Sequence, residues 1–330
     1  MGLRLADKWL WDFWFAQDGP DYHVFYLQAD RSPGDPERRH WQVSIGHAVS
    51  QDLQNWELLP DALRPSNPVK NGTGEAWDDY TTWTGSIIQH EGRWHLFYTG
   101  SKRSESGLVQ RIGLATSEDL LTWHKHPDNP LIEADPRWYE LLDLESWHDQ
   151  AWRDPWVFRY PVTGQFHAFI TARAKNGPAD ARGVIGHARS SDLLRWEVLP
   201  PVTDPGDFGH MEVPQVVAIE GRYYLLYSVP AEHYSAARRR RTGDDAVTGM
   251  HYLVADDPLG PYHREAGQLL IGDTVGLLYS GKLIRGTDER WYCIAFHNLN
   301  RRGEFVGALS DPMSVTMNRN GKLSVETVEC

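Results

Sequence analysis

Five short segments along the chain alternate apolar and polar residues and are rich in aromatic side chains. They are Tyr22–Tyr26, Trp94–Tyr98, Phe166–Ile170, Tyr223–Tyr227 and Trp291–Ala295. Alternation with a period of two predicts β-strands. A short turn rich in Gly or Asp precedes each segment, which predicts that each strand is the second arm of a hairpin.

A third strand follows each hairpin and repeats a pattern of small residues. The pattern Ile-Gly-x-Ala begins at Ile45, Ile112 and Ile185, and weaker copies lie at His251–Ala255 and Val306–Leu309. The copies start about 55 to 73 residues apart, and a unit of several short strands repeated in this way is typical of a β-propeller. The sequence therefore predicts an all-β fold, a five-bladed β-propeller that fills residues 1–330 as a single domain.

The strand before each turn is expected to be the first of its blade, nearest the axis. These segments are Trp11–Trp14, Trp83–Ser86, Arg153–Trp156, Met211–Pro214 and Leu278–Gly281. Three of them carry a carboxylate near the same point of the unit: Asp12, Asp154 and Glu212. An unpaired carboxylate costs several kcal/mol when it is buried, so its presence in an apolar inner strand indicates a binding site at the axis.

Composition and charge narrow the range of partners. The net charge of −12 disfavours nucleic acid and anionic membrane as partners. The basic run Arg238–Arg241 is the exception, and it lies in the least repetitive stretch, so we expect a solvated loop there. No stretch of the sequence approaches the length needed to span a bilayer.

Two cysteines, Cys293 and Cys330, are too few for a disulfide framework. Cys293 lies in an apolar run and is expected to be a small buried residue. The first residues, Met1–Lys8, show no apolar run of the kind found in signal peptides, which favours a cytoplasmic location.

Paired carboxyl groups at one site suit chemistry at the anomeric carbon of a sugar. One carboxyl group acts as the acid and another as the nucleophile or base, while a third can hold substrate hydroxyls. Like charges close together also push their pKa values apart, which leaves one carboxyl protonated. Aromatic residues expected to line this site are Trp11, Trp14, Trp83 and Trp156. The expected partner is a carbohydrate substrate, and no cofactor is predicted.

The same segments resemble the motifs of glycoside hydrolase clan J, families 32 and 68, which contain levansucrases and invertases. Leu10–Trp14 is similar to their nucleophile segment, and Trp83–Ser86 to their Trp-Ser-Gly-Ser segment. Trp152–Pro155 resembles the Arg-Asp-Pro motif, Met211–Pro214 the acid/base segment, and Tyr279 stands where levansucrase-like enzymes have a Tyr. The resemblance covers the chain from about Trp11 to Tyr279.

The resemblance implies an enzyme that retains anomeric configuration and acts on β-fructofuranosides such as sucrose or fructans. Asp12 would be the nucleophile, Glu212 the acid/base, and Asp154 the third catalytic carboxylate, which would hold ring hydroxyls. The substrate-binding residues would be Trp11, Trp83, Thr84, Arg153, His210 and Tyr279. Two departures from the family pattern are Thr84, which replaces a Ser, and His210, which replaces an acidic residue.

Two other interpretations stay open. An inverting arabinofuranosidase or xylosidase of families 43 and 62 would place a similar set of carboxylates in the same kind of propeller. Inversion needs carboxyl groups about 6.5–9.5 Å apart, against about 5–5.5 Å for retention. A propeller that binds sugar without catalysis would keep the aromatic residues but tolerate the loss of a carboxylate.

The histidines do not predict a metal site. His23, His95 and His167 recur at the same strand position in three units, and equivalent positions in different blades lie far apart away from the axis. Packing is therefore the expected role of these three, and of His47 and His187 in the third strands. The loops 67–79, 135–148 and 232–248 are expected to rim the site. The sequence does not determine the oligomeric state, or whether water or a sugar accepts the transferred unit.

Overall fold

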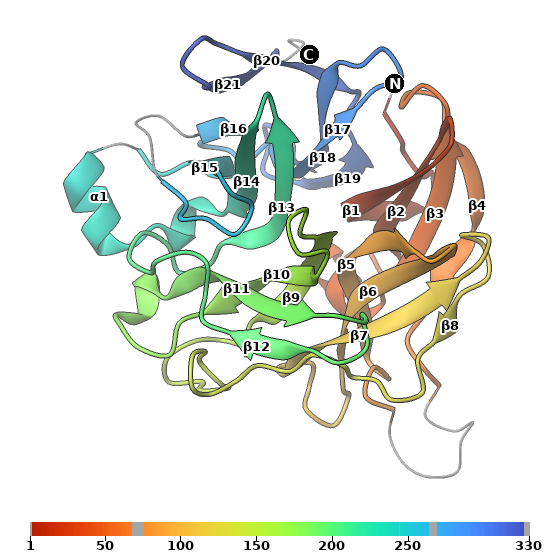
Figure 1. The fold of residues 1–330 in the computed structure, drawn as a ribbon, viewed down its shortest axis with the longest axis horizontal. Coiled ribbons are helices and arrows are strands. Elements are labelled where there is room, and N and C mark those ends of the chain that lie inside the picture. The colour runs from red at the N-terminus through yellow and green to blue at the C-terminus, as the bar shows by residue number, and fades with distance from the viewer. Residues whose placement is uncertain (1, 68–75, 244, 264–268, 327–330) are drawn as a thin grey trace.

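The computed structural model describes residues 2–67, 76–243, 245–263 and 269–326, which form the five-bladed β-propeller that the sequence predicts (Figure 1). Each blade is an antiparallel sheet whose strands follow one another in chain order from the axis outward. The first three blades contain β1 (Lys8–Asp18), β2 (Asp21–Asp30), β3 (Ser44–Ser50) and β4 (Glu57–Leu63); β5 (Thr81–His90), β6 (Arg93–Ser101), β7 (Gln110–Ser117) and β8 (His124–Lys125); β9 (Trp152–Arg159), β10 (Phe166–Arg173), β11 (Gly183–Ser190) and β12 (Glu197–Leu199).

The last two blades are built from the C-terminal part of the chain. They contain β13 (Glu212–Ile219), β14 (Arg222–Val229), β15 (Thr248–Ala255) and β16 (Leu269–Asp273); β17 (Leu278–Arg285), β18 (Trp291–Leu299), β19 (Phe305–Leu309), β20 (Met313–Met317) and β21 (Leu323–Val325). In the fifth blade both β19 and β20 pair with β18. The first strands β1, β5, β9, β13 and β17 contact their neighbours in a closed ring, so they surround the axis as predicted.

The Asp-Leu turn that precedes the fourth strand in the first three blades has a local explanation. Asp119 accepts hydrogen bonds from the backbone N–H groups of Leu121 and Thr122, and Leu120 adopts a positive φ of 62° with its side chain buried. The indole of Trp123 then donates to the Leu120 carbonyl. Asp52 and Asp192 cap the equivalent turns in the first and third blades. The repeat is therefore a turn motif that leads into the fourth strand of each of the first three blades.

Histidines of the second and third strands bond to each other within a blade. His23 Nδ1 lies 2.8 Å from His47 Nε2, and His167 Nδ1 lies 2.8 Å from His187 Nε2. Burial lowers the pKa of all four rings, which are packed among aromatic side chains such as Phe25. These contacts are the packing role that the sequence predicts.

The basic run Arg238–Arg241 is helical, so the prediction of a loop there is wrong. It lies in α1 (Ala236–Thr242), which Ser235 caps at its N-terminus and Gly243 ends with a positive φ of 64°. Arg238 and Arg241 form ion pairs with the buried Asp207, which explains how the run is held in place. Three short 3-10 helices, η1 (Pro36–Trp41), η2 (Ala179–Ala181) and η3 (Ala231–His233), complete the described structure.

Cys293 is buried as predicted, and burial raises the pKa of its thiol to about 12. Cys330 lies outside the described residues. Within those residues, no helix has the length and apolar character required to cross a membrane.

Candidate active site

Each of the five inner strands carries a β-bulge at the same point, where one or two residues have no partner on the second strand. In β1 the pairing passes from Trp11 to Phe13 and leaves out Asp12, and in β5 it passes from Trp83 to Gly85 and leaves out Thr84. The pairing is interrupted in the same way after Arg153, Glu212 and Tyr279. Bulges re-aim side chains, and here they turn one side of every inner strand toward the axis.

Two sets of equivalent residues result from these bulges. The bulged residues are Asp12, Thr84, Asp154, Val213 and Ser280, and the residues just before them are Trp11, Trp83, Arg153, Glu212 and Tyr279. When the five strands are aligned on their bulges, Glu212 therefore matches the residue before Asp12 and the residue before Asp154. Asp154, Val213 and Ser280 have positive φ angles of 58°, 52° and 52°, a conformation that costs energy for residues other than Gly and is common at functional sites.

Asp12 lies on β1 beside two hydroxyl groups. The Thr84 hydroxyl donates to Asp12 Oδ2 at 2.9 Å, so Thr84 is directed at the carboxylate. Burial raises the pKa of Asp12, the hydroxyls of Ser280 and Thr84 lower it, and the charge of Glu212 raises it again. The net effect is a raised pKa.

Asp154 is almost fully buried on β9. Its Oδ2 accepts hydrogen bonds from the Thr171 hydroxyl at 2.8 Å and from the backbone N–H of Val213 at 3.2 Å. Burial raises the pKa of Asp154 to about 7, although the positive charge of Arg153 opposes this; the charges of Asp12 and Glu212 add to the increase. Arg153 Nε lies 3.7 Å from Asp154 Oδ2 and Arg153 Nη2 lies 2.6 Å from Glu212 Oε1, so these two carboxylates share one guanidinium. The charge of Asp12 interacts with both, and the three carboxylates form one cluster.

Glu212 is held by two donors on different blades. Arg153 Nη2 donates to Glu212 Oε1 at 2.6 Å, and the Tyr279 hydroxyl donates to Oε2 at 2.6 Å. Burial raises the pKa of Glu212, but the Arg153 charge and the Tyr279 hydrogen bond outweigh it, so the pKa lies below its usual value. Arg153 also pairs with Asp149 at 3.2 Å.

His210 is buried between Arg153 and Trp147. The Trp147 indole donates to His210 Nε2 at 3.1 Å, and Arg153 Nη2 lies 3.2 Å from His210 Nδ1. Burial lowers the pKa of His210 well below its usual value, so the ring is neutral. Trp147 is a site residue that the sequence does not single out, because its loop has no counterpart in the other blades.

Lys282 is a second residue that the sequence analysis misses. It lies on β17, is 1% exposed, and its ammonium bonds the Val213 and Pro214 carbonyls directly after Glu212, where it also interacts with the charges of Asp12 and Asp154. A lone lysine in the inner strand Leu278–Arg285 is the same kind of signal as the three carboxylates, since it places a charge at the crowded axis.

The predicted aromatic lining is only partly correct. Trp14 is fully buried and stacks on Phe25 in the core, so its assignment to the site is wrong. The bulge at Asp12 shifts the alternation of β1 by one residue and turns Trp14 away from the carboxylate's face. Trp11 is buried against the His40 ring, whereas Trp83 and Trp156 remain half-buried.

Two of the predicted rim loops reach this cluster. Trp147 belongs to the loop 135–148, and the ring of His233, from the loop 232–248, lies 5.3 Å from that of His210. Residue 244 of the latter loop and residues 68–75 of the loop 67–79 lie outside the described residues.

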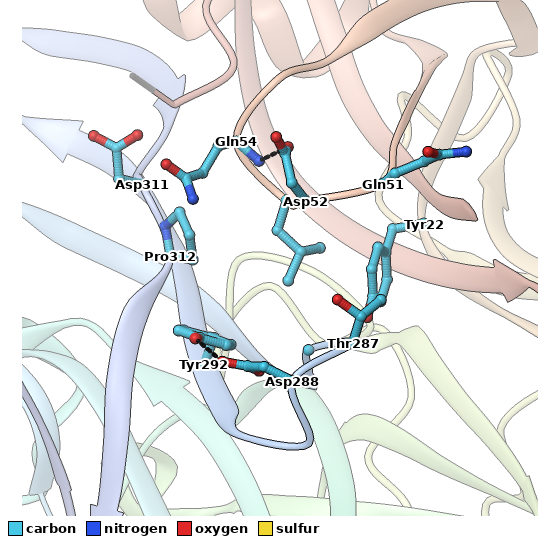
Figure 2. Close-up of a pocket in the computed structure, with 11 residues that line it drawn as sticks. Tyr22, Gln51, Asp52, Gln54, Thr287, Asp288, Tyr292, Asp311 and Pro312 are labelled. Atoms are coloured by element: carbon cyan, nitrogen blue, oxygen red, sulfur yellow. Dashed lines mark hydrogen bonds between the residues drawn. The ribbon is translucent and has the colours of Figure 1, made fainter. Parts of the chain in front are cut away.

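A separate hollow of about 300 Å³ lies at the β17–β18 turn, between the first and fifth blades (Figure 2). Its carboxylates already have local partners, since Asp52 caps a turn and Asp288 accepts a hydrogen bond from the Tyr292 hydroxyl at 2.7 Å. The carboxylate cluster lies toward the other end of β17, beside Tyr279 and Ser280, and none of its residues lines this hollow.

Known proteins match this chain over most of its length. The model of the glycosyl hydrolases family 32 N-terminal domain matches residues 14–307, a stretch that begins just after Asp12. An extracellular sucrase of Zymomonas mobilis is 26% identical over 96% of this chain and 81% of its own length.

Solved structures share the fold at lower identity. The inulosucrase from Halalkalicoccus jeotgali bound to kestose has a TM-score of 0.76 at 22% identity, over 97% of this chain and 87% of its own. A thermostable family-43 glycoside hydrolase has a TM-score of 0.68 at 17% identity, over 98% of this chain and 94% of its own. The propeller is therefore common to families 32 and 43, and the family model distinguishes between them.

Proposed function

The chain belongs to glycosyl hydrolase family 32, and from this premise we propose that it acts on β-fructofuranosides such as sucrose or a fructan. The observation that carries the proposal is the buried cluster of Asp12, Asp154 and Glu212 on three inner strands of the propeller. The sucrase relative supports sucrose as a substrate, and the inulosucrase with the same fold supports transfer to a sugar as an alternative to hydrolysis.

The proposed reaction is a double displacement. A carboxylate oxygen of Asp12 attacks the anomeric carbon while the carboxylic acid of Glu212 gives its proton to the leaving glycosidic oxygen. Water or a sugar hydroxyl then attacks the covalent intermediate and loses its proton to Glu212, which releases Asp12. The two inversions give net retention. Asp154 accepts hydrogen bonds from hydroxyls of the bound ring, with Arg153 beside it.

The electrostatics of the free protein oppose this distribution of protons. The reaction needs Glu212 protonated and Asp12 ionised, but Arg153 and Tyr279 lower the pKa of Glu212 while burial raises that of Asp12. The reactive form is then a minor one. A bell-shaped pH profile results, with its acid limb set by Glu212 and its alkaline limb set by Asp12, both as macroscopic values of the coupled cluster.

Asp12→Asn and Glu212→Gln should each lower kcat by about 10³-fold or more while the protein stays folded, because each removes a group that forms or breaks bonds. The measurement is release of fructose from sucrose, levan and inulin, with folding checked by circular dichroism. A matched control is Asp119→Asn, which alters a turn of the second blade and should leave kcat unchanged.

The products separate the competing functions. Retention at the released fructose, followed by NMR immediately after cleavage, and fructosyl oligosaccharides at high sucrose both agree with the proposal. Net inversion would remove Asp12 as the nucleophile, and release of arabinose from aryl arabinofuranosides would favour the family-43 type of activity. Binding of sugar without turnover would leave only a binding module.

The location of the protein stays a prediction. The sequence favours the cytoplasm, whereas the sucrase relative is extracellular, and fractionation of the producing cells would decide between them.

A further inference from the structure

Lys282 connects the two strands that carry the acid/base and the third carboxylate. Its ammonium donates hydrogen bonds to the backbone carbonyls of Val213 at 3.0 Å and Pro214 at 3.2 Å. Both carbonyls belong to the β13 bulge, directly after Glu212, where they have no partner on β14. Lys282 therefore supplies the hydrogen bonds that these two carbonyls do not receive from β14.

Val213 needs such support because it is β-branched and has a φ of 52°. A β-branched residue in this region is strained, and the conformation persists only where surrounding contacts hold it. The Val213 N–H donates to Asp154 Oδ2 at 3.2 Å, while its carbonyl accepts from Lys282. One peptide segment is therefore fixed from both sides, with Glu212 immediately before it.

The charge of Lys282 also matters for the carboxylates. Asp12 interacts with the Thr84 and Ser280 hydroxyls and with Glu212, Lys282 and Tyr279, while Asp154 interacts with Arg153, Thr171, Asp12, Glu212 and Lys282. Arg153 is engaged by Glu212 and Asp149. Lys282 is a cation whose charge acts on both Asp12 and Asp154.

We propose that Lys282 is a positioning residue of the reaction: its buried ammonium fixes the bulge behind Glu212 and supplies a positive charge that favours the ionised forms of Asp12 and Asp154. The inference rests on the proposed function for its role in turnover. The Trp156 ring, 5.6 Å from the ammonium, forms one wall of the lysine's pocket.

Replacing Lys282 by Met, a neutral side chain of similar length, should raise the pKa of Asp12 by about one unit, since an opposite charge nearby shifts a carboxyl by this amount or more. The alkaline limb of kcat/KM for sucrose should then move up by about one pH unit. At the optimum kcat/KM should fall about tenfold, because less Asp12 is ionised when Glu212 is protonated. Lys282→Arg, which keeps the charge, should leave the limb near its original position.

Lys125→Met is the matched control. Lys125 also lies in a buried ion pair, with Asp78 at 2.5 Å, but in the second blade and with no contact to the cluster. The variant should lower the melting temperature without moving either limb of the profile. If Lys282 had only a structural role, Lys282→Met would also lower the melting temperature and leave both limbs of the pH profile in place.

The carboxyl ¹³C shift of labelled aspartate provides a readout that does not need turnover. The Asp12→Asn spectrum identifies the Asp12 resonance, which should titrate at higher pH in Lys282→Met and in Lys282→Gln than in the parent. In the parent it should show a second step near pH 8, where Lys282 loses its proton, because burial lowers the pKa of Lys282 to about 8.

The outcomes separate the two claims. A protein that releases no fructose would end the proposed function, and the titration would still test the electrostatic role of Lys282. The inference is overturned if Asp12 titrates identically in the parent and in a folded neutral variant. If neither neutral variant folds, the absence of the second step in the parent overturns it.

Discussion

At the scale of the single residue, Asp154 holds a charge in a place where burial opposes ionisation. Its side chain is 4% exposed, and burial raises its pKa from 3.8 to about 7 despite the neighbouring Arg153. The unfolded chain would ionise this group near pH 3.8. The folded state therefore loses stability as pH rises from about 3.8 to about 7, which is the sign expected for an acid whose folded pKa is raised.

Asp154→Asn should remove this loss. The amide oxygen can still accept hydrogen bonds from Thr171 and Val213, so the contacts remain while the charge disappears. We expect the melting temperature of the variant, relative to the parent, to increase from pH 4 to pH 8 while kcat falls. Thermal unfolding across this pH range checks the prediction.

Asp119→Asn is a control for which the change of stability with pH should have the opposite sign. Backbone N–H groups of Thr122 and Leu121 lower the pKa of Asp119 to about 2, so its stabilising effect is present above pH 3.8 and lost toward pH 2. This variant should be destabilised at pH 7 and approach the parent at low pH. A difference for Asp154→Asn that does not vary with pH would contradict the explanation.

Candidate site residues could be predicted from the sequence only where they interrupt the repeated strand pattern. Asp12, Asp154 and Glu212 stand out because they interrupt apolar inner strands. Lys282 gives the same signal, but it lies one residue beyond Leu278–Gly281, the part of the strand in which the repeat is recognised. Trp147 comes from a loop without any repeat, and only the fold brings it to His210.

At the scale of the element, the inner strands combine regular pairing with a bulge at the site. Hairpin turns and aromatic alternation predicted the strands, and the described blades follow that order. The bulges were not predicted, because an inner strand such as β1 is apolar on both faces and has no regular alternation that an extra residue could interrupt. That extra residue accounts for the wrong assignment of Trp14, which alternation alone places on the side of Asp12.

Gly85→Ala tests whether the β5 bulge positions the donor to Asp12. A Cβ at Gly85 would lie 2.1 Å from the Phe97 carbonyl oxygen, so the backbone must shift and carry Thr84 with it. Loss of the 2.9 Å hydrogen bond from Thr84 should raise the pKa of Asp12 further. We expect a melting temperature lower by several degrees and kcat/KM lower by about tenfold, measured by calorimetry and sucrose hydrolysis.

Two variants separate the causes of that effect. Thr84→Val removes the hydroxyl without moving the backbone and should lower kcat/KM alone. Gly92→Ala strains the β5–β6 turn, where φ is 74° and space is open, and should lower stability alone. Unchanged kcat/KM in both Gly85→Ala and Thr84→Val would show that the bulge has no part in positioning Asp12.

At the scale of the whole molecule, the ring closes between blades built from opposite ends of the chain. In the described sheets, β1–β4 form the first blade and β17–β21 the fifth, and neither blade borrows a strand from the other. The ring is closed instead by contacts between the first and fifth blades, and we call this boundary the seam. The Leu309 N–H donates to the Leu3 carbonyl at 2.9 Å, and the Trp9 and Phe305 rings meet edge to face at 6.5 Å.

Arg31 spans this seam, so Arg31→Ala should weaken ring closure. Its guanidinium donates to the Lys8 carbonyl at 2.8 Å and to those of Val306 and Gly307 at 3.0 and 3.3 Å. Three lost hydrogen bonds should cost roughly 3 kcal/mol and lower the melting temperature by roughly 4 °C.

The control for closure is Arg159→Ala, which removes an exposed arginine that bonds the Gly164 carbonyl within the third blade. It should change the melting temperature by no more than about 2 °C, since both partners lie in one turn. Asp12 and Tyr279 come from the two blades that Arg31 joins, so its loss should also make activity decline at a lower temperature than in the control. Equal melting temperatures for the two variants would show that the ring closes without Arg31, and that the apolar contacts of the seam are sufficient.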